Sequence, residues 1–180
     1  MFEALLPGGA RQRTEPPLVV ARVAAERWQI EAYFRLRRAI FALEQGLFGE
    51  TDRDAHDQHA TPIVAETSIA GMPDRVVGVV RIYSERDGVW FGGRLGVDPD
   101  YRRVGAIGTA LITEAVSTAN GFGARRFLAT VQQRNVRYFQ RHQFQPLEAV
   151  EVCGQPHWLM EADLEQYPAR LSSTWHGRVA

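Results

Sequence analysis

Lysine is absent from this chain of 180 residues, so all of its 21 basic residues are arginine. This absence excludes a lysine Schiff base and the lysine of a P-loop. An anion must instead be bound by arginine side chains or by backbone N–H groups. The 21 acidic residues balance the arginines, and the formal net charge is zero. The chain as a whole therefore has no field that would draw it onto nucleic acid or an anionic membrane.

Cysteine is nearly absent, and long apolar runs are missing. Cys153 is the single cysteine, which excludes an internal disulfide and a cysteine-rich zinc site. No window approaches the roughly 20 apolar residues of a membrane-spanning helix. Residues 1–17 lack the basic start and apolar stretch of a signal peptide. We therefore expect a cytoplasmic protein with no membrane partner.

The chain is long enough for one domain with one hydrophobic core. Residues 1–17 are rich in proline and glycine and are predicted to form a flexible lead-in. Residues 18–163 carry the periodic patterns of a single folded domain. Residues 164–180 have no clear period and are predicted to be a C-terminal tail.

Apolar periodicity predicts an alternation of strands and helices. Helices are expected over residues 28–46, 104–120 and 135–142, and strands over residues 18–24, 62–70, 75–84, 88–97, 126–132, 144–152 and 157–162. Turn signals between the strands from 62 to 97 indicate an antiparallel meander. The strand–helix–strand unit from 89 to 132 should be parallel and right-handed. The fold class is thus α/β (α+β), a mixed, mostly antiparallel sheet of about six or seven strands with helices on both faces.

The segment from Leu95 to Leu111 carries the clearest chemical signal. A strand ends there, Asp98-Pro99-Asp100 makes a turn, and a helix begins with small residues. The first N–H groups of a helix have no partner within it and carry partial positive charge. Small residues let an anion approach these groups, and Arg102 and Arg103 add formal charge. The segment predicts a phosphate-binding site, although small residues at a helix start can also serve close packing on a sheet.

This segment resembles the cofactor signature of the GNAT superfamily of N-acetyltransferases, Arg/Gln-x-x-Gly-x-Gly/Ala. In the best register Arg103 comes first, Ala106 stands at the first glycine and Gly108 at the second. The resemblance implies acetyl-CoA as co-substrate, no metal, and a twisted sheet whose central parallel strands splay apart. The positions that it assigns to the cofactor are Leu95, Val97, Arg102, Arg103, Val104, Gly105, Ala106, Gly108, Thr109, Asn135 and Tyr138.

A second match to the same family lies at Asn135, Tyr138-Phe139 and Phe144. The resemblance implies that the asparagine helps to hold the pantetheine arm and that a tyrosine protonates the leaving thiolate. Here Phe139 occupies the position of that tyrosine, and Tyr138 comes one residue earlier. One residue turns a helical side chain by about 100°. Tyr138 is therefore either a catalytic acid or a packing aromatic.

The strand over residues 88–97 contains Gly92, Gly93 and Gly96, which suit a bulge or a close approach of the backbone. The alternative is that these glycines relieve crowding. The family resemblance implies that backbone N–H groups at residues 95–97 stabilise the developing oxyanion.

No carboxylate lies in the strand over residues 88–97, so the general base must come from elsewhere. Glu44 could face the cleft from the first helix, where neighbouring apolar surface would raise its pKa. It could equally be a solvated residue near a helix end. Weaker candidates are Asp57, His59, Glu66 and His142, and the amine could also lose its proton to water.

The stretch from Gly49 to Thr61 is acidic, with aspartates at 52, 54 and 57 and histidines at 56 and 59. It lacks the frame of a hard-cation loop, so no metal site is expected. Two interpretations remain open: an acidic rim that favours a cationic amine, or a plain solvated loop.

These observations predict an N-acetyltransferase that moves the acetyl group of acetyl-CoA to a primary amine of a small molecule or peptide, by direct attack in a ternary complex. One alternative is a non-catalytic acyl-CoA-binding sensor. Another is an acyl-homoserine-lactone synthase. The helix containing Leu36-Arg37-Arg38, Phe41 and Glu44-Gln45 resembles a subgroup of the same transferases, and these synthases share its general layout. No nucleic-acid partner is expected, and the sequence leaves a homodimer, the commonest soluble oligomer, open.

Overall fold

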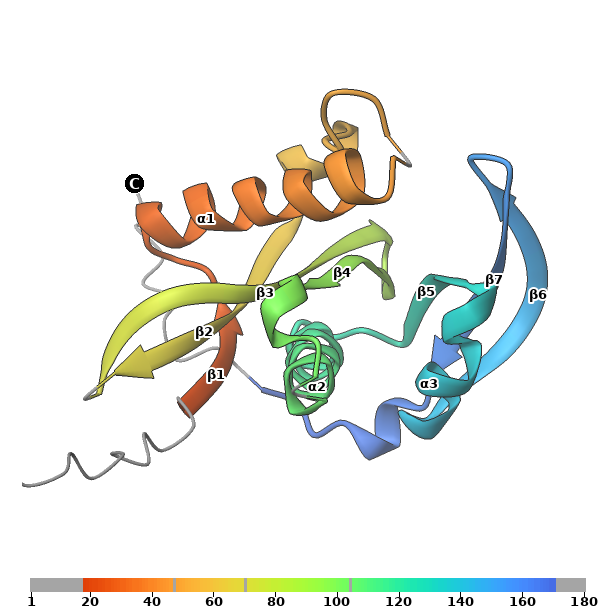
Figure 1. Ribbon diagram of the computed structural model, residues 1–180. Helices are drawn as coiled ribbons and strands as arrows, with labels where there is room; N and C mark the ends of the chain where they lie inside the picture. Colours follow the sequence, from red (N-terminus) through yellow and green to blue (C-terminus); the bar gives the residue numbers. More distant parts are fainter. Residues whose placement is uncertain (1–17, 47, 70, 104, 171–180) are drawn as a thin grey trace, which may run out of the picture.

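The computed structural model describes residues 18–46, 48–69, 71–103 and 105–170 (Figure 1). One seven-stranded sheet has the order β1-β2-β3-β4-β5-β7-β6. Its strands are β1 (Leu18–Val23), β2 (Thr61–Ile69), β3 (Met72–Arg86), β4 (Val89–Val97), β5 (Arg126–Gln132), β6 (Phe144–Val152) and β7 (Gln155–Ala162). The α-helices are α1 (Arg27–Arg37), α2 (Ala106–Gly121) and α3 (Val136–Arg141).

The sheet is mixed, and its central pair splays apart. Strands β2 to β4 form the predicted antiparallel meander, and β1 extends it by pairing antiparallel with β2. Strands β4 and β5 are parallel, and their pairing joins Val89–Gly92 to Arg126–Ala129 before it stops. Strands β7 and β6 then continue the sheet from β5 in antiparallel fashion. Figure 1 shows β5, β7 and β6 diverging from the meander, which confirms the predicted splayed sheet.

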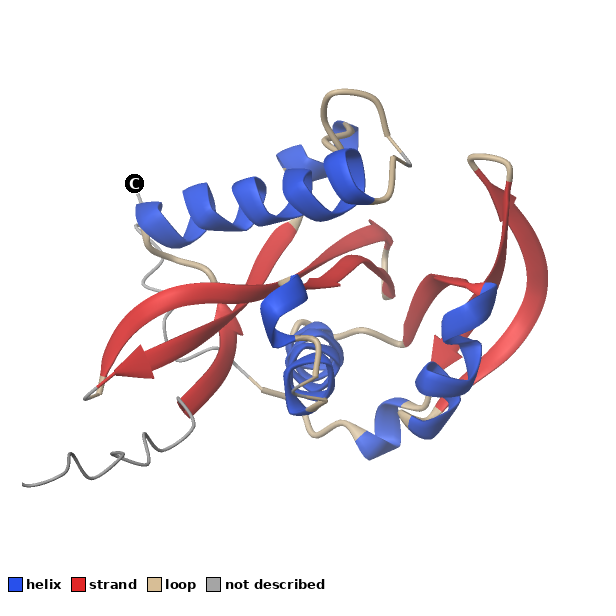
Figure 2. Cartoon of the chain, viewed as in Figure 1, coloured by secondary structure: helices blue, strands red, loops and turns tan. Residues whose placement is uncertain are grey.

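Helices cover both faces of the sheet, as expected (Figure 2). Helix α1 packs on one face, where the buried ring of Tyr33 contacts valines of β2 and β3. Helix α2 packs on the other face through the predicted four-residue stripe of Ile107, Leu111, Ala115 and Ala119, all of them buried. A stripe repeating every four residues faces one side of a helix, so the pattern fixes which face of α2 meets the sheet.

The ends of two helices differ from the predictions. The first helix was expected as one α-helix over residues 28–46, but after Arg37 it widens into a π-helix, Arg38–Glu44, in which the Gln45 N–H donates to the Ile40 carbonyl at 3.0 Å. The second begins at Ala106 instead of residue 104. A separate short turn, Pro99–Tyr101, precedes it, and the Asp98 carboxylate caps that turn by accepting from the Asp100 N–H at 3.0 Å.

Part of the predicted C-terminal tail belongs to the core. Tyr167 is buried against the main cluster, and the Asn120 side chain donates to its carbonyl at 2.7 Å. The Arg170 N–H donates to the Ser117 carbonyl at 3.0 Å. Residues 164–170 therefore pack along α2. The predicted lead-in, residues 1–17, and residues 171–180 lie outside the described part of the chain. Among the described helices, none is long and apolar enough to cross a membrane.

Candidate active site

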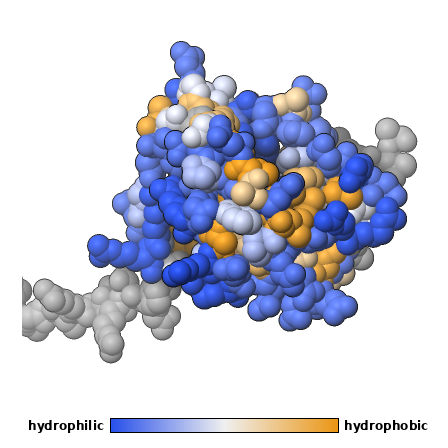
Figure 3. Space-filling view, turned by 90° about the vertical axis from the view of Figure 1, so that its right-hand side faces the viewer, coloured by the Kyte–Doolittle hydropathy of each residue, from blue (hydrophilic) through white to orange (hydrophobic). Residues whose placement is uncertain are grey.

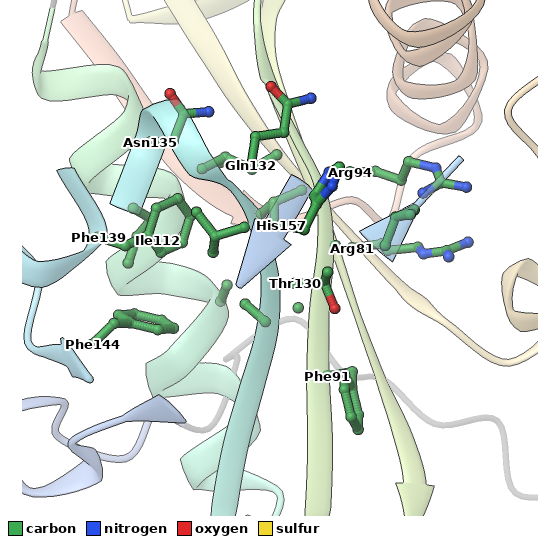
Figure 4. A pocket seen from close by; sticks show the side chains of 18 of the residues that line it. Arg81, Phe91, Arg94, Ile112, Thr130, Gln132, Asn135, Phe139, Phe144 and His157 are labelled. Carbon is green, nitrogen blue, oxygen red and sulfur yellow. The ribbon is translucent and has the colours of Figure 1, made fainter. Parts of the chain in front are cut away.

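A cavity of about 320 Å³ runs through the gap where β4 and β5 separate, within the usual range for a small-molecule site. On the α1 face its wall is made by Phe41, Phe48, Arg81, Tyr83, Phe91 and Arg94. On the α2 face it is made by Leu95, Ile112, Ala115, Val116, Phe127, Phe139 and Phe144. The polar side chains of Thr130, Gln132, Asn135, Cys153 and His157 also line the cavity. Figure 4 shows the two arginines and the apolar group on opposite sides of the strands.

The surface near the β6–β7 end of the sheet also combines an apolar centre with polar surroundings. Figure 3 shows hydrophobic residues gathered in the middle of that face, with hydrophilic residues around them. An apolar concavity with a few polar groups is typical of a ligand site.

Strand β4 bulges beside the cavity. Gly93 lies opposite Arg81 and Gly96 opposite Val79, so Arg94 and Leu95 face a single residue of β3. The predicted bulge is present, but its left-handed residue is Arg94, with φ 55°, and not a glycine. After Gly92 the β5 edge of β4 loses its strand partner. The backbone groups of that edge are therefore free to bond a ligand in the gap.

Close approach explains two of the strand glycines. A Cβ atom on Gly92 would lie 2.7 Å from the ring of Phe127, and one on Gly96 would lie 2.8 Å from Ile40. Contacts this short require displacement of the neighbouring side chain, so both positions favour glycine for steric reasons. Gly93 is different, because a Cβ there would meet only Arg81, at 3.8 Å.

The start of α2 has the small residues and open space that a phosphate site needs. Gly105 caps the helix, and a Cβ there would meet nothing within 4 Å. Ala106 is exposed, Gly108 is half-buried, and Thr109 donates to the Gly105 carbonyl at 3.3 Å. Arg103 is exposed, whereas the predicted site residue Val104 lies outside the described residues. The residues present thus fit a pyrophosphate at the free N–H groups of the first turn.

Glu44 does not have the environment predicted for a base. Its carboxylate forms a two-pronged ion pair with Arg102, at 2.7 and 2.6 Å, and is about two-fifths exposed. The Arg102 hydrogen bonds hold the pKa of Glu44 below its ordinary value, despite slight burial. The expectation of a raised pKa was wrong, because the nearest group is a guanidinium and not apolar surface. Arg102 also donates to the carbonyl of Val97, at 3.0 Å, and Val97 itself does not line the cavity.

Tyr138 and Phe139 are neighbours on α3, and their side chains point in different directions, as helical geometry predicts. Phe139 is buried and lines the cavity, whereas Tyr138 is not among the lining residues. The Tyr138 hydroxyl lies 2.5 Å from where a Cβ of Gly108 would be, over the start of α2. The structure therefore places this hydroxyl by the helix start and not in the gap between the strands. Asn135, at the start of α3, does line the cavity.

The four weaker base candidates also lie away from the cavity wall. Glu66 is buried on β2, where it accepts from Gln29 at 2.8 Å. His142 packs against Tyr138, and burial followed by the nearby Arg141 lowers its pKa. His59 lies beside Tyr83, and Asp57 is held by arginines.

His157 is a wall residue that the sequence patterns did not single out. It is buried on β7, and its Nδ1 lies 2.8 Å from the Gln155 carbonyl oxygen. A carbonyl can only accept, so Nδ1 carries the proton in the neutral ring and Nε2 is left as a proton acceptor. An isolated histidine in a strand gives no signal in the sequence, and only its position in the cavity wall identifies it.

The acidic stretch before β2 is largely exposed, but its aspartates are held in ion pairs. Arg37 is fully buried and pairs with Asp52 at 2.7 Å and with Asp57 at 2.5 Å. Arg81 pairs with Asp54 at 2.6 Å. These carboxylates neutralise arginines contributed by α1 and β3, so they are not free to attract a cationic amine.

This network shifts the pKa of its members strongly. Burial opposes ionisation of Asp57, but hydrogen bonds from Arg37, the Asp54 backbone and Arg81 outweigh it and hold its pKa far below the ordinary range. Burial likewise opposes the charge on Arg37, yet its hydrogen bonds to Asp57 and Asp52, together with the nearby Tyr33, leave its pKa raised. For Arg94, burial and the neighbouring Arg81 lower the pKa. Among the described residues, no group of histidine, cysteine and acidic side chains is arranged to hold a metal ion.

Comparison with known proteins agrees with this geometry. The model of the acetyltransferase (GNAT) family matches residues 22–144. This chain belongs to the GNAT family. Its fold is similar to that of a putative N-acetyltransferase from Lactobacillus plantarum, with a TM-score of 0.71 and 22% identity, over 81% of this chain and 98% of that one. Escherichia coli ElaA is similar with a TM-score of 0.65 and 22% identity, over 82% and 100% of the two chains.

The fold is also similar to that of a CoA-dependent acyl-homoserine lactone synthase, BjaI, with a TM-score of 0.61 and 20% identity, over 83% of this chain and 84% of that one. Identities this low show the fold alone. The GNAT assignment accounts for the splayed central strands, and the substrates must be argued from this chain's own residues.

Proposed function

We propose that this GNAT protein is an N-acetyltransferase that transfers the acetyl group of acetyl-CoA directly to a primary amine of a small molecule or peptide. The cavity between β4 and β5 carries the proposal. It continues from the face covered by α2 to the face covered by α1, so two substrates can enter from opposite faces and meet in the gap. Such an arrangement supplies the proximity that a bimolecular acyl transfer needs.

The donor would bind on the α2 face. The free N–H groups at the start of α2 would hold the pyrophosphate, with open space at Gly105. Ala106, Gly108 and Thr109 complete the first turn beside it, and Arg102 and Arg103 would add charge. Asn135 and Leu95 line the cavity where the pantetheine arm would enter the gap. The bulged edge of β4 would then offer backbone N–H groups to the thioester oxygen.

In the proposed step the amine nitrogen forms a bond to the acyl carbon, the bond between that carbon and sulfur breaks, and the CoA thiolate leaves. The amine gives up a proton. His157 is suited to take it, because the Gln155 carbonyl fixes the proton of the neutral ring on Nδ1 and leaves Nε2 basic. Tyr138 and Glu44 have no comparable position in the cavity wall, and the thiolate would take its proton from water.

Calorimetry and turnover together test the proposal. Acetyl-CoA is expected to bind the purified protein with micromolar affinity, and an amine library is expected to include substrates that release free CoA thiol. In His157→Gln, kcat should fall by about 10²–10³-fold. Unchanged kcat in that variant would remove His157 from the mechanism.

One observation favours a second candidate, the transfer of an acyl group longer than acetyl. Ile112, Phe127, Phe139 and Phe144 are core residues, yet they line open space. Protein interiors rarely leave such space empty. Acyl-CoAs with two to eight carbons should be compared as donors. A maximum of kcat/KM beyond two carbons would replace acetyl by the longer group, whereas binding without turnover on any amine would favour a non-catalytic acyl-CoA sensor.

A further inference from the structure

The charged groups in the cavity wall are nearly all of one sign. Arginines 81, 94 and 134 line it, together with His157, and among the described wall residues there is no aspartate or glutamate. The carboxylate of Asp54 pairs with both Arg81 and Arg94, and it is not among the residues that line the cavity. The wall therefore presents the positive ends of its ion pairs to a ligand.

Arg81 carries an unused hydrogen-bond donor at this wall. Its side chain is 4% exposed, and both of its terminal nitrogens bond to Asp54. Its Nε is buried and has no hydrogen-bond partner. Burying a charged N–H without a partner is costly, and native proteins mostly avoid it. Gly93 leaves the space beside this atom open, because it has no side chain to cover it.

Arg94 provides a second cation next to that donor. It stands in the bulge with φ 55°, a conformation that non-glycine residues rarely adopt. Its contacts with the carboxylates of Asp52 and Asp54 are 3.3 and 3.2 Å long, whereas Arg37 and Arg81 bond the same carboxylates at 2.7 and 2.6 Å. Arg94 also donates to the Asp52 carbonyl at 3.1 and 3.3 Å. The guanidinium stacks on Phe48 at 4.0 Å and lines the cavity. A strained arginine with weak partners is well placed to bond a ligand.

Both arginines lie on the other side of the strands from Ile112, Phe139 and Phe144 (Figure 4). We propose that Arg81 Nε and Arg94 bind a carboxylate of the acceptor, so that the acceptor is an amino acid or a similar amine with an anionic group. This inference rests on the proposed transferase function and names its acceptor class. A carboxylate held there directs the amino group toward the gap. Nearby guanidinium groups also favour the neutral, nucleophilic form of an amine.

The test compares acceptors that differ in one charge. Leucine and phenylalanine are assayed with acetyl-CoA against leucinamide and phenylalaninamide, and the release of CoA thiol is followed. We expect kcat/KM at least tenfold higher for the acids than for the amides. In Arg94→Gln this ratio should fall to near one, and Arg94→Lys should retain part of it. Amides used as well as acids by the native protein would overturn the inference while leaving the transferase function standing.

A second variant avoids disturbing the ion pairs. Gly93→Ala adds a methyl group 3.8 Å from Arg81 Nε, an ordinary contact distance, so the fold should persist and the melting temperature should change little. The acid-to-amide ratio should nevertheless fall several-fold, because the methyl group restricts access to the donor. An unchanged ratio in both Gly93→Ala and Arg94→Gln would also overturn the inference.

Binding without an acyl donor separates the two proposals. N-acetyl-leucine and N-acetyl-leucinamide are titrated into the native protein and into Arg94→Gln. Preferential binding of the acid, lost in the variant, supports the anionic subsite even where no amine is acetylated, a result that would sink only the transferase function. Equal affinities for the two ligands, or no binding of either, would contradict the subsite.

Discussion

The two faces of the β4–β5 gap are built in opposite ways. On the α2 face the candidate phosphate site consists of backbone N–H groups and small residues, all within one short segment that includes Gly105 and Gly108. On the α1 face the site consists of charged side chains, and Arg37, Arg81 and Arg94 are held by aspartates 15 to 42 residues away in the chain. A local backbone feature and a long-range side-chain network thus meet at one cavity.

The two faces should contribute differently to the stability of the fold. Ion pairs that are buried are costly to break, since removing one partner leaves an uncompensated charge. Exposed pairs contribute little. Substitutions on the α1 face should therefore lower both the stability of the fold and the affinity for ligand. Substitutions at the start of α2 should leave stability nearly unchanged and lower mainly the affinity for ligand.

The largest effect on stability should come from replacing Arg37 on the α1 face. Arg37→Met leaves Asp52 buried without its main partner, and we expect the free energy of unfolding to fall by about 3–5 kcal/mol. Urea denaturation followed by circular dichroism measures the loss. The matched control is Arg38→Met, at an exposed neighbour, which should change stability by less than ~0.5 kcal/mol. Similar losses in both variants would show that the buried ion pairs of Arg37 contribute no more to stability than an exposed arginine does.

The next largest effect should come from the α2 face, and it should appear in binding. Gly108→Glu brings a carboxylate to the first turn of α2, where we expect phosphate. Displacing the Tyr138 hydroxyl, 2.5 Å from the added Cβ, is possible because it ends a side chain. The Kd for acetyl-CoA should rise by about 30-fold, roughly 2 kcal/mol, in calorimetry.

Gly49→Glu is the control for that experiment, since it adds the same charge at an exposed site where a Cβ meets nothing within 4 Å. Its Kd should match that of the native protein. If Gly108→Glu binds acetyl-CoA as tightly as Gly49→Glu does, the phosphate does not lie at this helix start.

Acid should weaken the α1 face selectively. Because the folded pKa of Asp57 is held below its unfolded value, the carboxylate stabilises the fold above the unfolded pKa of ~3.9, and this contribution is lost as the pH falls below it. The free energy of unfolding should therefore drop between about pH 5 and pH 2. In Asp57→Asn the drop should be smaller by roughly 1–2 kcal/mol, whereas an identical pH dependence would contradict the assignment.

The smallest effect should come from the exposed pair of Glu44 and Arg102. Glu44→Gln should cost less than ~1 kcal/mol of stability. It also frees Arg102 beside the candidate phosphate site, so acetyl-CoA should bind about two- to fivefold more tightly at low salt. Glu161→Gln breaks a comparable pair with Arg126, at 2.6 and 2.9 Å, and should leave the Kd unchanged. A tenfold loss of kcat in Glu44→Gln would restore Glu44 as the base.

The sequence by itself determined the family, the order of the elements and the small residues at the start of α2. These features rest on local rules: periodicity selects helix or strand, and free N–H groups at a helix start are a property of one segment. The widening of the first helix at Arg38 was not predictable in this way, because its packing against Gly96 involves a distant strand.

Only the tertiary structure decided the chemistry of the cavity wall. It paired Asp52 and Asp57 with Arg37, paired Glu44 with Arg102, and turned Phe139 instead of Tyr138 into the gap. The physical reason is that a carboxylate or an aromatic ring takes its pKa and its role from whatever lies within a few ångströms. Those neighbours come from strands and helices that are far apart in the sequence.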